Sequence, residues 1–178
     1  MHSQRTVYTI GYGSRELSEL LNLLVQYGVE LVVDVRRWTK SKRRPEFSSE
    51  NLKAALEARG LGYAWIPELG GYRKFGVDVE DYDIAQCFES EGFRAYATYI
   101  TRNPAAKPYL EKLVELAKAR TVALFCREAV PWLCHRKILS DYLVARGFRV
   151  VHILDKDRVV EHKLSKCAVV EQGELKYL

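Results

Sequence analysis

The chain has 178 residues, a length typical of one domain, and its 48% of apolar and 29% of charged residues are those of an ordinary soluble globular protein. No apolar run is as long as a membrane span, and the start of the chain lacks the apolar core of a signal peptide, so we expect a cytoplasmic protein with no membrane contact. The net charge of +5 is compatible with a phosphate-bearing partner but does not establish one.

The first part of the chain alternates short β-rich runs with helical patterns. A β-rich run over 6–11 ends in glycine, and residues 15–28 carry leucines at helical spacing up to a final glycine. Residues 29–36 form a continuous apolar run, typical of a strand buried on both faces of a parallel sheet. A helix is then predicted over 48–60, and residues 61–69 predict a third strand that Pro67 ends.

An irregular stretch separates this part from the next. Residues 70 to about 90 combine glycines, mixed charges and aromatic residues, which predicts a long loop. The elements predicted after the loop are helices over 93–100 and 107–120, a strand over 121–126, a helix over 133–147 and a strand over 148–154.

Alternating strands and helices predict a single α/β domain over residues 1–178. We expect three layers, α/β/α, around a mostly parallel sheet. The last residues, about 155–178, contain a turn and short alternating runs, and predict a short β extension at the C-terminus. Right-handed crossovers would bring the carboxyl ends of the strands to one edge, where ligands bind in sheets of this kind.

The loops after the first four predicted strands carry glycine, arginine and carboxylate residues. A structural turn uses glycine but has no need of arginine, so these loops predict a cleft that binds an anion. The expected substrate-binding residues are Gly11, Ser14, Asp34, Arg36, Ser41, Glu68, Gly70, Gly71, Arg73 and Arg136. Four cations within residues 40–44 either contact phosphates or form a solvated face. The aromatic residues of the same loops, which either stack a base or pack in the core, are Trp38, Phe47, Tyr72 and Phe75.

The segment FCREAVPWLCHR, residues 125–136, concentrates reactive side chains between a strand and a helix. The candidate catalytic residues are Cys126, Glu128, Cys134 and His135. A helix N-terminus stabilises a thiolate, and His135 would serve as acid or base. The alternative is that Cys126 is a core residue, because cysteine is often buried. A phosphatase-like loop is disfavoured because Trp132 stands where its arginine would be.

The four cysteines, Cys87, Cys126, Cys134 and Cys167, form no CxxC pair and no disulfide scaffold, so we expect reduced thiols. A zinc site would need four ligands, and the available set is Cys126, Cys134 and His135 with His152 or His162. Their spacing is not that of the usual short zinc motifs, so no metal site is predicted. The sequence does not indicate a cofactor or an oligomeric state.

The segments TIGYGS, LVVDVRRWTKS, YAWIPELGGYR, FCREAVPWLCHR and VVHIL follow one another in this order, and together they resemble the domain of unknown function family 488 over residues 6 to 165. The resemblance implies a three-layer α/β fold with its signature residues at one sheet edge, and no settled activity. Besides the candidates above, these residues include Phe47 and Leu69, with His152 and His162. Tyr12 stands where the family often has histidine, so any role of that side chain is in doubt.

Three hypotheses follow from these patterns. The first is an enzyme, a hydrolase or transferase, that acts on a nucleotide or nucleic acid at the cleft. The second is a non-catalytic module that binds nucleic acid or a nucleotide through the cations of residues 40–44. The third is a structural network of buried ion pairs among Glu68, Glu128, Arg36, Arg73 and Arg136, with no ligand.

Overall fold

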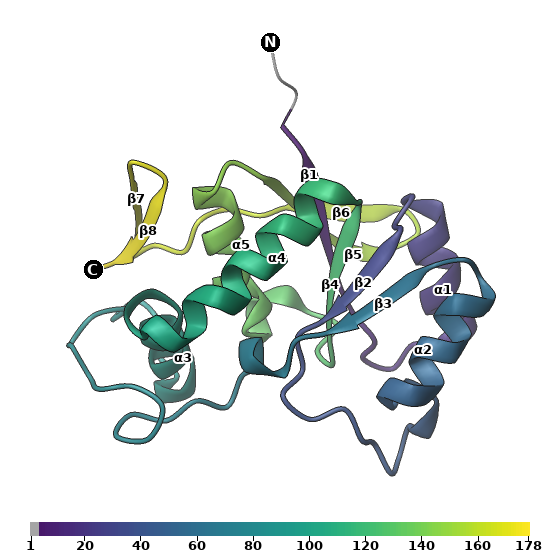
Figure 1. Cartoon of the computed structure of the whole chain (residues 1–178), viewed down its shortest axis with the longest axis horizontal. Coiled ribbons are helices and arrows are strands. Elements are labelled where there is room, and N and C mark those ends of the chain that lie inside the picture. The colour runs from purple at the N-terminus through teal and green to yellow at the C-terminus, as the bar shows by residue number, and fades with distance from the viewer. Residues whose placement is uncertain (1–3) are drawn as a thin grey trace.

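A computed structural model describes residues 4–178 and shows a six-stranded sheet at the centre of the molecule (Figure 1). Its strand order is β3-β2-β4-β1-β5-β6. The strands are β1 (Thr6–Gly11), β2 (Leu31–Asp34), β3 (Gly62–Trp65), β4 (Val122–Cys126), β5 (Arg149–Asp155) and β6 (Arg158–Glu161). The first five pair in parallel, and β6 runs antiparallel to β5.

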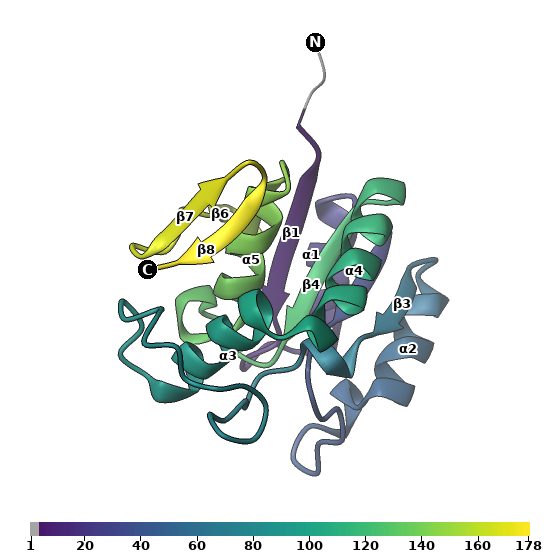
Figure 2. The same cartoon turned by 60° about the vertical axis from the view of Figure 1, so that its left-hand side comes forward.

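Helices cover both faces of this sheet, which confirms the predicted three-layer α/β/α fold (Figures 1 and 2). On one face lie α1 (Leu17–Gln26) and α2 (Ser49–Ala58), whose buried leucines form one core cluster. The other face is covered by α3 (Glu91–Arg102), α4 (Lys107–Ala119) and α5 (Arg136–Ala145). The strands β2 and β4 are buried along their whole length because helices cover both of their sides.

Short 3-10 turns that begin at proline border two of the predicted elements. The third strand ends at Trp65, just before Pro67 as predicted, and Pro67 begins a short 3-10 helix, Pro67–Leu69. The predicted helix 133–147 begins later, at Arg136, because another 3-10 turn, Pro131–Leu133, precedes it. Both turns place their following residues at the sheet edge described below.

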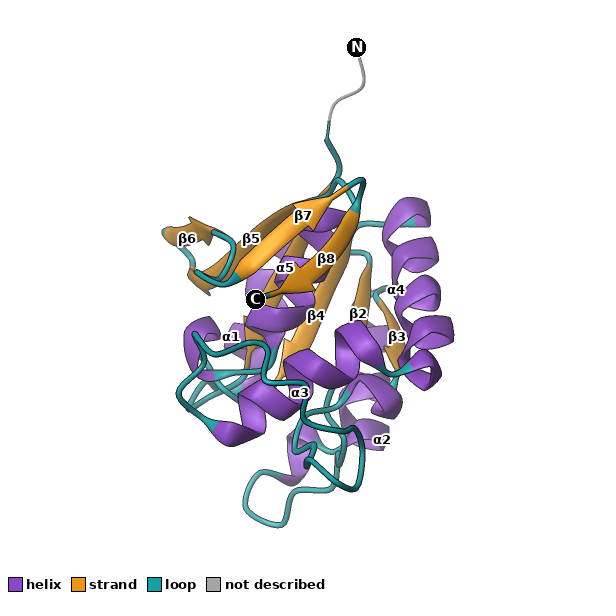
Figure 3. Cartoon of the chain, turned by 90° about the vertical axis from the view of Figure 1, so that its left-hand side faces the viewer, coloured by secondary structure: helices purple, strands orange, loops and turns teal. Residues whose placement is uncertain are grey.

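The C-terminal extension divides into two parts. Strand β6 joins the edge of the main sheet, whereas β7 (Ala168–Glu171) and β8 (Glu174–Tyr177) form a separate antiparallel hairpin. This hairpin lies over α5 (Figure 3), and its buried Leu175 and Tyr177 belong to the core cluster on that face. The predicted β extension is therefore present, and it closes one end of a helical layer.

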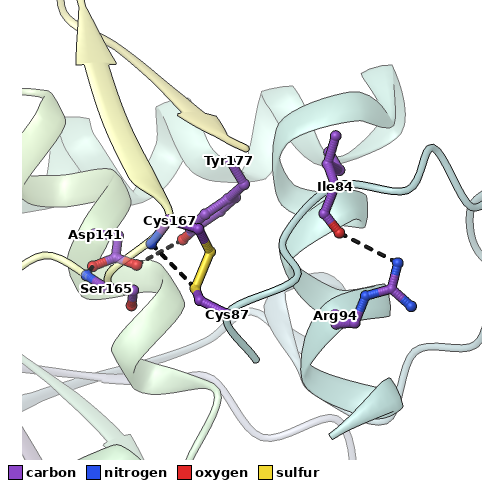
Figure 4. The surroundings of a disulfide bond; sticks show 7 residues. All are labelled: Ile84, Cys87, Arg94, Asp141, Ser165, Cys167 and Tyr177. Carbon is purple, nitrogen blue, oxygen red and sulfur yellow. Dashed lines mark hydrogen bonds between the residues drawn. A yellow bond between two sulfur atoms is a disulfide. The ribbon is translucent and has the colours of Figure 1, made fainter. Parts of the chain in front are cut away.

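The expectation of four reduced thiols is wrong for two of them. Cys87, in the loop before α3, forms a disulfide with Cys167, just before β7 (Figure 4). The two positions are 80 residues apart, so their spacing carried no sign of the contact that the folded hairpin makes. Cys126 and Cys134 are free thiols, as expected, and both are buried. The cytoplasmic location stays a prediction, and a disulfide is unusual in a reducing cytosol.

No helix among residues 4–178 is long and apolar enough to span a membrane. The first three residues, part of the start that predicts no signal peptide, lie outside the described residues.

Candidate functional site

Three neighbouring strands end at the same edge of the sheet and open into a cavity. In the register of the sheet Gly11 lies beside Cys126, and Asp34 lies beside Phe125, so the loops after β1, β2 and β4 start side by side. A cavity of about 980 Å³ lies at this edge. Of the predicted site residues, those that line it are Ser14, Arg36, Ser41, Gly71, Cys126, Glu128, Cys134 and His135.

The cavity wall is strongly cationic. Its lining cations are Arg36, Arg37, Lys40, Lys42, Arg43, Arg44 and Arg127, and Glu128 is the one carboxylate among the described lining residues. Arg36 and Arg44 pair with Asp34 and Glu46, whereas the other five have no carboxylate within ion-pair distance in the described chain. Such an excess of positive charge in a concave site attracts an anion.

Asp34 is fully buried behind the cavity and positions Arg36. The Nε and Nη2 groups of Arg36 donate to the Asp34 carboxylate at 2.9 and 2.7 Å. The Tyr63 hydroxyl donates to the same carboxylate at 2.6 Å. Burial lowers the pKa of Arg36, but the bond with Asp34 outweighs it, so the pKa is raised. The guanidinium lies 4.9 Å from the centre of the Phe125 ring. The carboxylate therefore holds one fixed cation at the wall.

Cys134 and His135 form a thiol–imidazole pair in the same wall. His135 Nε2 lies 2.8 Å from the carbonyl oxygen of Val35, which can only accept, so this nitrogen carries a proton. The other nitrogen, Nδ1, lies 3.6 Å from Cys134 Sγ. A neutral ring thus presents an unprotonated Nδ1 to the thiol, the arrangement that a general base needs.

The surroundings shift the pKa values of the two free thiols in opposite directions. Burial alone would raise the pKa of Cys134, but the hydrogen bond from Cys126 and the charges of His135 and Arg136 hold it well below its usual value. The main-chain N–H of Arg136 also donates to Cys134 Sγ at 3.4 Å. Burial and the neighbouring Cys134 raise the pKa of Cys126 well above normal. Of the two free thiols, Cys134 is therefore the one that loses its proton more readily.

Arg136 lies behind the cavity and does not line it. Its guanidinium is fully buried and donates to Thr9 Oγ1 at 3.0 Å and to the carbonyl oxygen of Glu128 at 2.6 Å. Within residues 4–178 it makes no salt bridge with a carboxylate. Arg136 thus places a buried positive charge near Cys134, and its bond to the Glu128 carbonyl holds the loop after β4 in place.

A buried relay of hydrogen bonds leads away from Arg136. Thr9 lies 2.6 Å from His152 Nδ1, His152 Nε2 lies 2.9 Å from His162 Nδ1, and His162 Nε2 lies 2.8 Å from Asp141. The Tyr177 hydroxyl closes it by donating to Asp141. Arg136 donates at one end of this relay, and the Asp141 carboxylate accepts at the other. With both histidines neutral, every link between them has one donor and one acceptor. Neither His152 nor His162 lines the cavity.

Two predicted binding residues are glycines for reasons of close packing. A Cβ on Gly11 would lie 1.7 Å from the Glu128 carbonyl oxygen, and a Cβ on Gly70 would lie 2.4 Å from the main chain of Arg37. Neither glycine lines the cavity. Gly11 lets the loops after β1 and β4 pack in contact, and Gly70 does the same for the loops after β2 and β3.

The loop after β3 is held by Arg73, which also lies off the cavity. Arg73 donates to the carbonyl oxygens of Gly70 and Glu68 and pairs with Asp78. In the described chain no salt bridge joins Glu68 or Glu128 to Arg36, Arg73 or Arg136. The ion-pair network of the third hypothesis is therefore not formed.

Sequence reasoning missed several lining residues. Arg127 lies next to Cys126 and Glu128 in the chain, and that position was its only signal. Tyr12, whose role was in doubt, lines the cavity and stacks on Phe47 with ring centres 4.4 Å apart. Tyr96 comes from α3, a helix that carried no motif, and its ring meets His135 edge-on. These contacts join separate elements of the fold, and the spacing of residues along the chain does not show which elements pack together.

Within residues 4–178 no group of three or more histidine, cysteine, aspartate or glutamate side chains could hold a metal ion. The set weighed for zinc does not assemble, because His152 and His162 lie in the buried relay.

Comparison with known proteins identifies a family. No curated protein matches the chain, and no solved structure does. A family model, described as Domain of unknown function DUF488, matches residues 16–143, which include α1 to α4, the thiol–imidazole pair and most of α5. Because this match covers most of the chain, the protein belongs to the DUF488 family.

Proposed function

We propose that the protein is an enzyme, a hydrolase or transferase, that acts on a phosphate-containing substrate, either a nucleotide or a nucleic acid. The observation that carries the proposal is the Cys134–His135 pair in the wall of a cavity lined by seven cations and one carboxylate. Cations select an anionic substrate, and a thiolate with a depressed pKa is a nucleophile at neutral pH.

The groups have distinct roles in this proposal. Arg36, fixed by Asp34, and the unpaired cations of the wall hold the phosphate. Cys134 Sγ bonds to the electrophilic atom of the substrate while the bond to the leaving group breaks and its electron pair departs with that group. His135 Nδ1 holds the thiol proton and returns it to the leaving group. Glu128, exposed in the wall, activates the water or acceptor that releases the product.

Thiol labelling tests the nucleophile. Iodoacetamide should alkylate Cys134 at neutral pH faster than free cysteine, and tripolyphosphate should protect it by occupying the cationic wall. Peptide mass spectrometry reads the labelled site, and Cys126 is the internal control, because it is also a free buried thiol but its pKa is raised. Labelling of Cys134 no faster than free cysteine would overturn the proposal.

The five unpaired cations would equally serve a non-catalytic binding module, so a second test separates the two functions. Cys134→Ser should abolish the conversion of nucleoside triphosphates or oligonucleotides, measured by chromatography, while their binding persists. A wild-type protein that binds these ligands, converts none of them and has an unreactive Cys134 is a binding module.

A further inference from the structure

Two large aromatic side chains stand exposed at the mouth of the cavity. Trp38, in the loop after β2, and Tyr72, in the loop after the Pro67–Leu69 turn, are 63% and 68% exposed, and both line the cavity. Their ring centres lie 5.4 Å apart. Phe47, from the same group of loop aromatics, is buried in the core. Core packing therefore accounts for Phe47 and leaves Trp38 and Tyr72 unexplained.

The protein holds these two rings in place. Arg37 donates from Nη1 to the carbonyl oxygen of Tyr72 at 2.8 Å, and its guanidinium lies 5.0 Å from the centre of the Trp38 indole. Tyr72 has a φ of 62°, in the left-handed region that a residue with a bulky side chain rarely adopts. An unfavourable backbone conformation that exposes a ring, rather than burying it, is typical of a functional position.

Unpaired cations continue from this aromatic pair. Arg37, Lys40, Lys42 and Arg43 follow one another along the loop after β2 and line the cavity, with no carboxylate at ion-pair distance in the described chain. An aromatic surface beside a line of cations matches a ligand with bases and a row of phosphates. A nucleoside monophosphate carries one phosphate, whereas a nucleic acid carries a row of them, so four unpaired cations favour the longer ligand.

We propose that Trp38 and Tyr72 form a stacking platform for the bases of single-stranded nucleic acid, whose backbone follows residues 37–43. The inference rests on the proposed function, because it names the substrate class of the same cavity. A single strand is favoured over a duplex because its base faces are free to stack. The platform would stack a base at the mouth and direct the adjoining phosphate toward Arg36 and Cys134.

Fluorescence anisotropy with a labelled oligothymidylate and an abasic strand of equal length tests the platform, since the two ligands differ only in their bases. Wild-type protein should bind the oligothymidylate more tightly. Trp38→Ala should weaken that binding by about tenfold and leave the abasic strand unaffected. Trp132→Ala is the matched control, because Trp132 is 57% exposed and lies off the cavity. Equal affinity for the two strands, or no effect of Trp38→Ala, would overturn the inference.

A third ligand separates the single strand from its building block. Thymidine monophosphate that binds as tightly as the oligothymidylate would overturn the choice of a single strand. The measurements are repeated in Cys134→Ser, which removes the nucleophile and leaves the platform. Suppose that Cys134→Ser still binds the oligothymidylate more tightly than the abasic strand, and that Cys134 of the wild type is unreactive. The enzyme proposal then fails and the stacking platform stands. A reactive, tripolyphosphate-protected Cys134 without base dependence means the reverse.

Discussion

His135 shows how one side chain sets the reactivity of its neighbour. The Val35 carbonyl fixes its tautomer, and its Nδ1 faces Cys134. Burial lowers the pKa of His135, but the Cys134 thiolate and the Val35 carbonyl outweigh burial, and the net pKa is raised. A protonated ring beside a thiolate lowers the pKa of that thiol, so each group favours the charged form of the other.

His135→Gln should therefore shift the pH profile of Cys134 alkylation to higher pH, because the charge that stabilises the thiolate is lost. In the wild type the rate should stay high as pH falls below the usual cysteine pKa of about 8.5. Quench-flow labelling read by peptide mass spectrometry measures the profile of Cys134 alone and keeps Cys126, whose hydrogen bond helps to lower the pKa of Cys134, in place. An unchanged profile in His135→Gln would show that the imidazole does not control the thiol.

Gly11 illustrates a position where the lack of space for a Cβ alone requires glycine. Gly11→Ala places a Cβ against the Glu128 carbonyl and should lower the free energy of unfolding by about 1–3 kcal/mol, the usual cost of overpacking. Urea denaturation measures the loss. Gly92→Ala is the control, because its Cβ would meet Ser90 Oγ at an ordinary 3.6 Å, and alanine is favoured over glycine in helix α3, so stability should not fall. Equal stability of both variants would contradict the packing argument.

At the scale of elements, α5 links the site to the interior. Its first residue, Arg136, secures the loop after β4, and Asp141, in its second turn, ends the relay through His152 and His162. The hairpin strand β8 adds the Tyr177 hydroxyl to Asp141. The relay therefore joins β1, α5, β5 and the C-terminal hairpin through buried polar contacts that must all be satisfied.

The relay makes stability depend on pH. Burial, with the neighbouring His162, lowers the pKa of His152 to about 3. The folded pKa lies below the unfolded value of about 6.5, so between these values the unfolded chain binds more protons and stability falls as the solution is acidified. The loss is about 1.4 kcal/mol per pH unit in that window. His152→Gln should remove this slope in urea titrations run at several pH values, and an unchanged slope would assign it to other groups.

At the scale of the whole molecule, the disulfide joins distant parts of the chain. Cys87–Cys167 ties the loop before α3 to the base of the C-terminal hairpin, close to Asp141 and Tyr177 (Figure 4). The bond encloses much of the second half of the chain, including α3, α4, β4 and α5. It therefore constrains the unfolded chain over a long loop and holds the hairpin against one helical layer.

Cys87→Ser should lower the free energy of unfolding by about 2–4 kcal/mol, because the unfolded chain regains the freedom of that loop. Urea denaturation with and without dithiothreitol measures the effect. Dithiothreitol should destabilise the wild type and leave Cys87→Ser unchanged, since Cys126 and Cys134 are already thiols. A wild type insensitive to dithiothreitol would show that the bond contributes little to stability.

The sequence by itself determined the fold class and the edge at which the site lies. Continuous apolar runs such as 29–36 and helical spacing such as that of 15–28 report local burial, and parallel strands bring their carboxyl ends together. Cys126, Cys134 and His135 could therefore be placed at one edge before any contact was known. Asp34 and Arg36, both predicted binding residues, are two positions apart in the chain, and the structure joins them in an ion pair.

Only the tertiary structure decided which of these residues meet the cavity and which support it. Arg73 and Arg136, like Arg36, follow the ends of predicted strands. Their guanidinium groups, however, donate to main-chain carbonyl oxygens behind the loops. The disulfide, the relay and the pairing of Trp38 with Tyr72 join segments from different loops or layers. The physical reason is that residue type and spacing report the environment along one element, whereas the partner of a side chain depends on how separate elements pack.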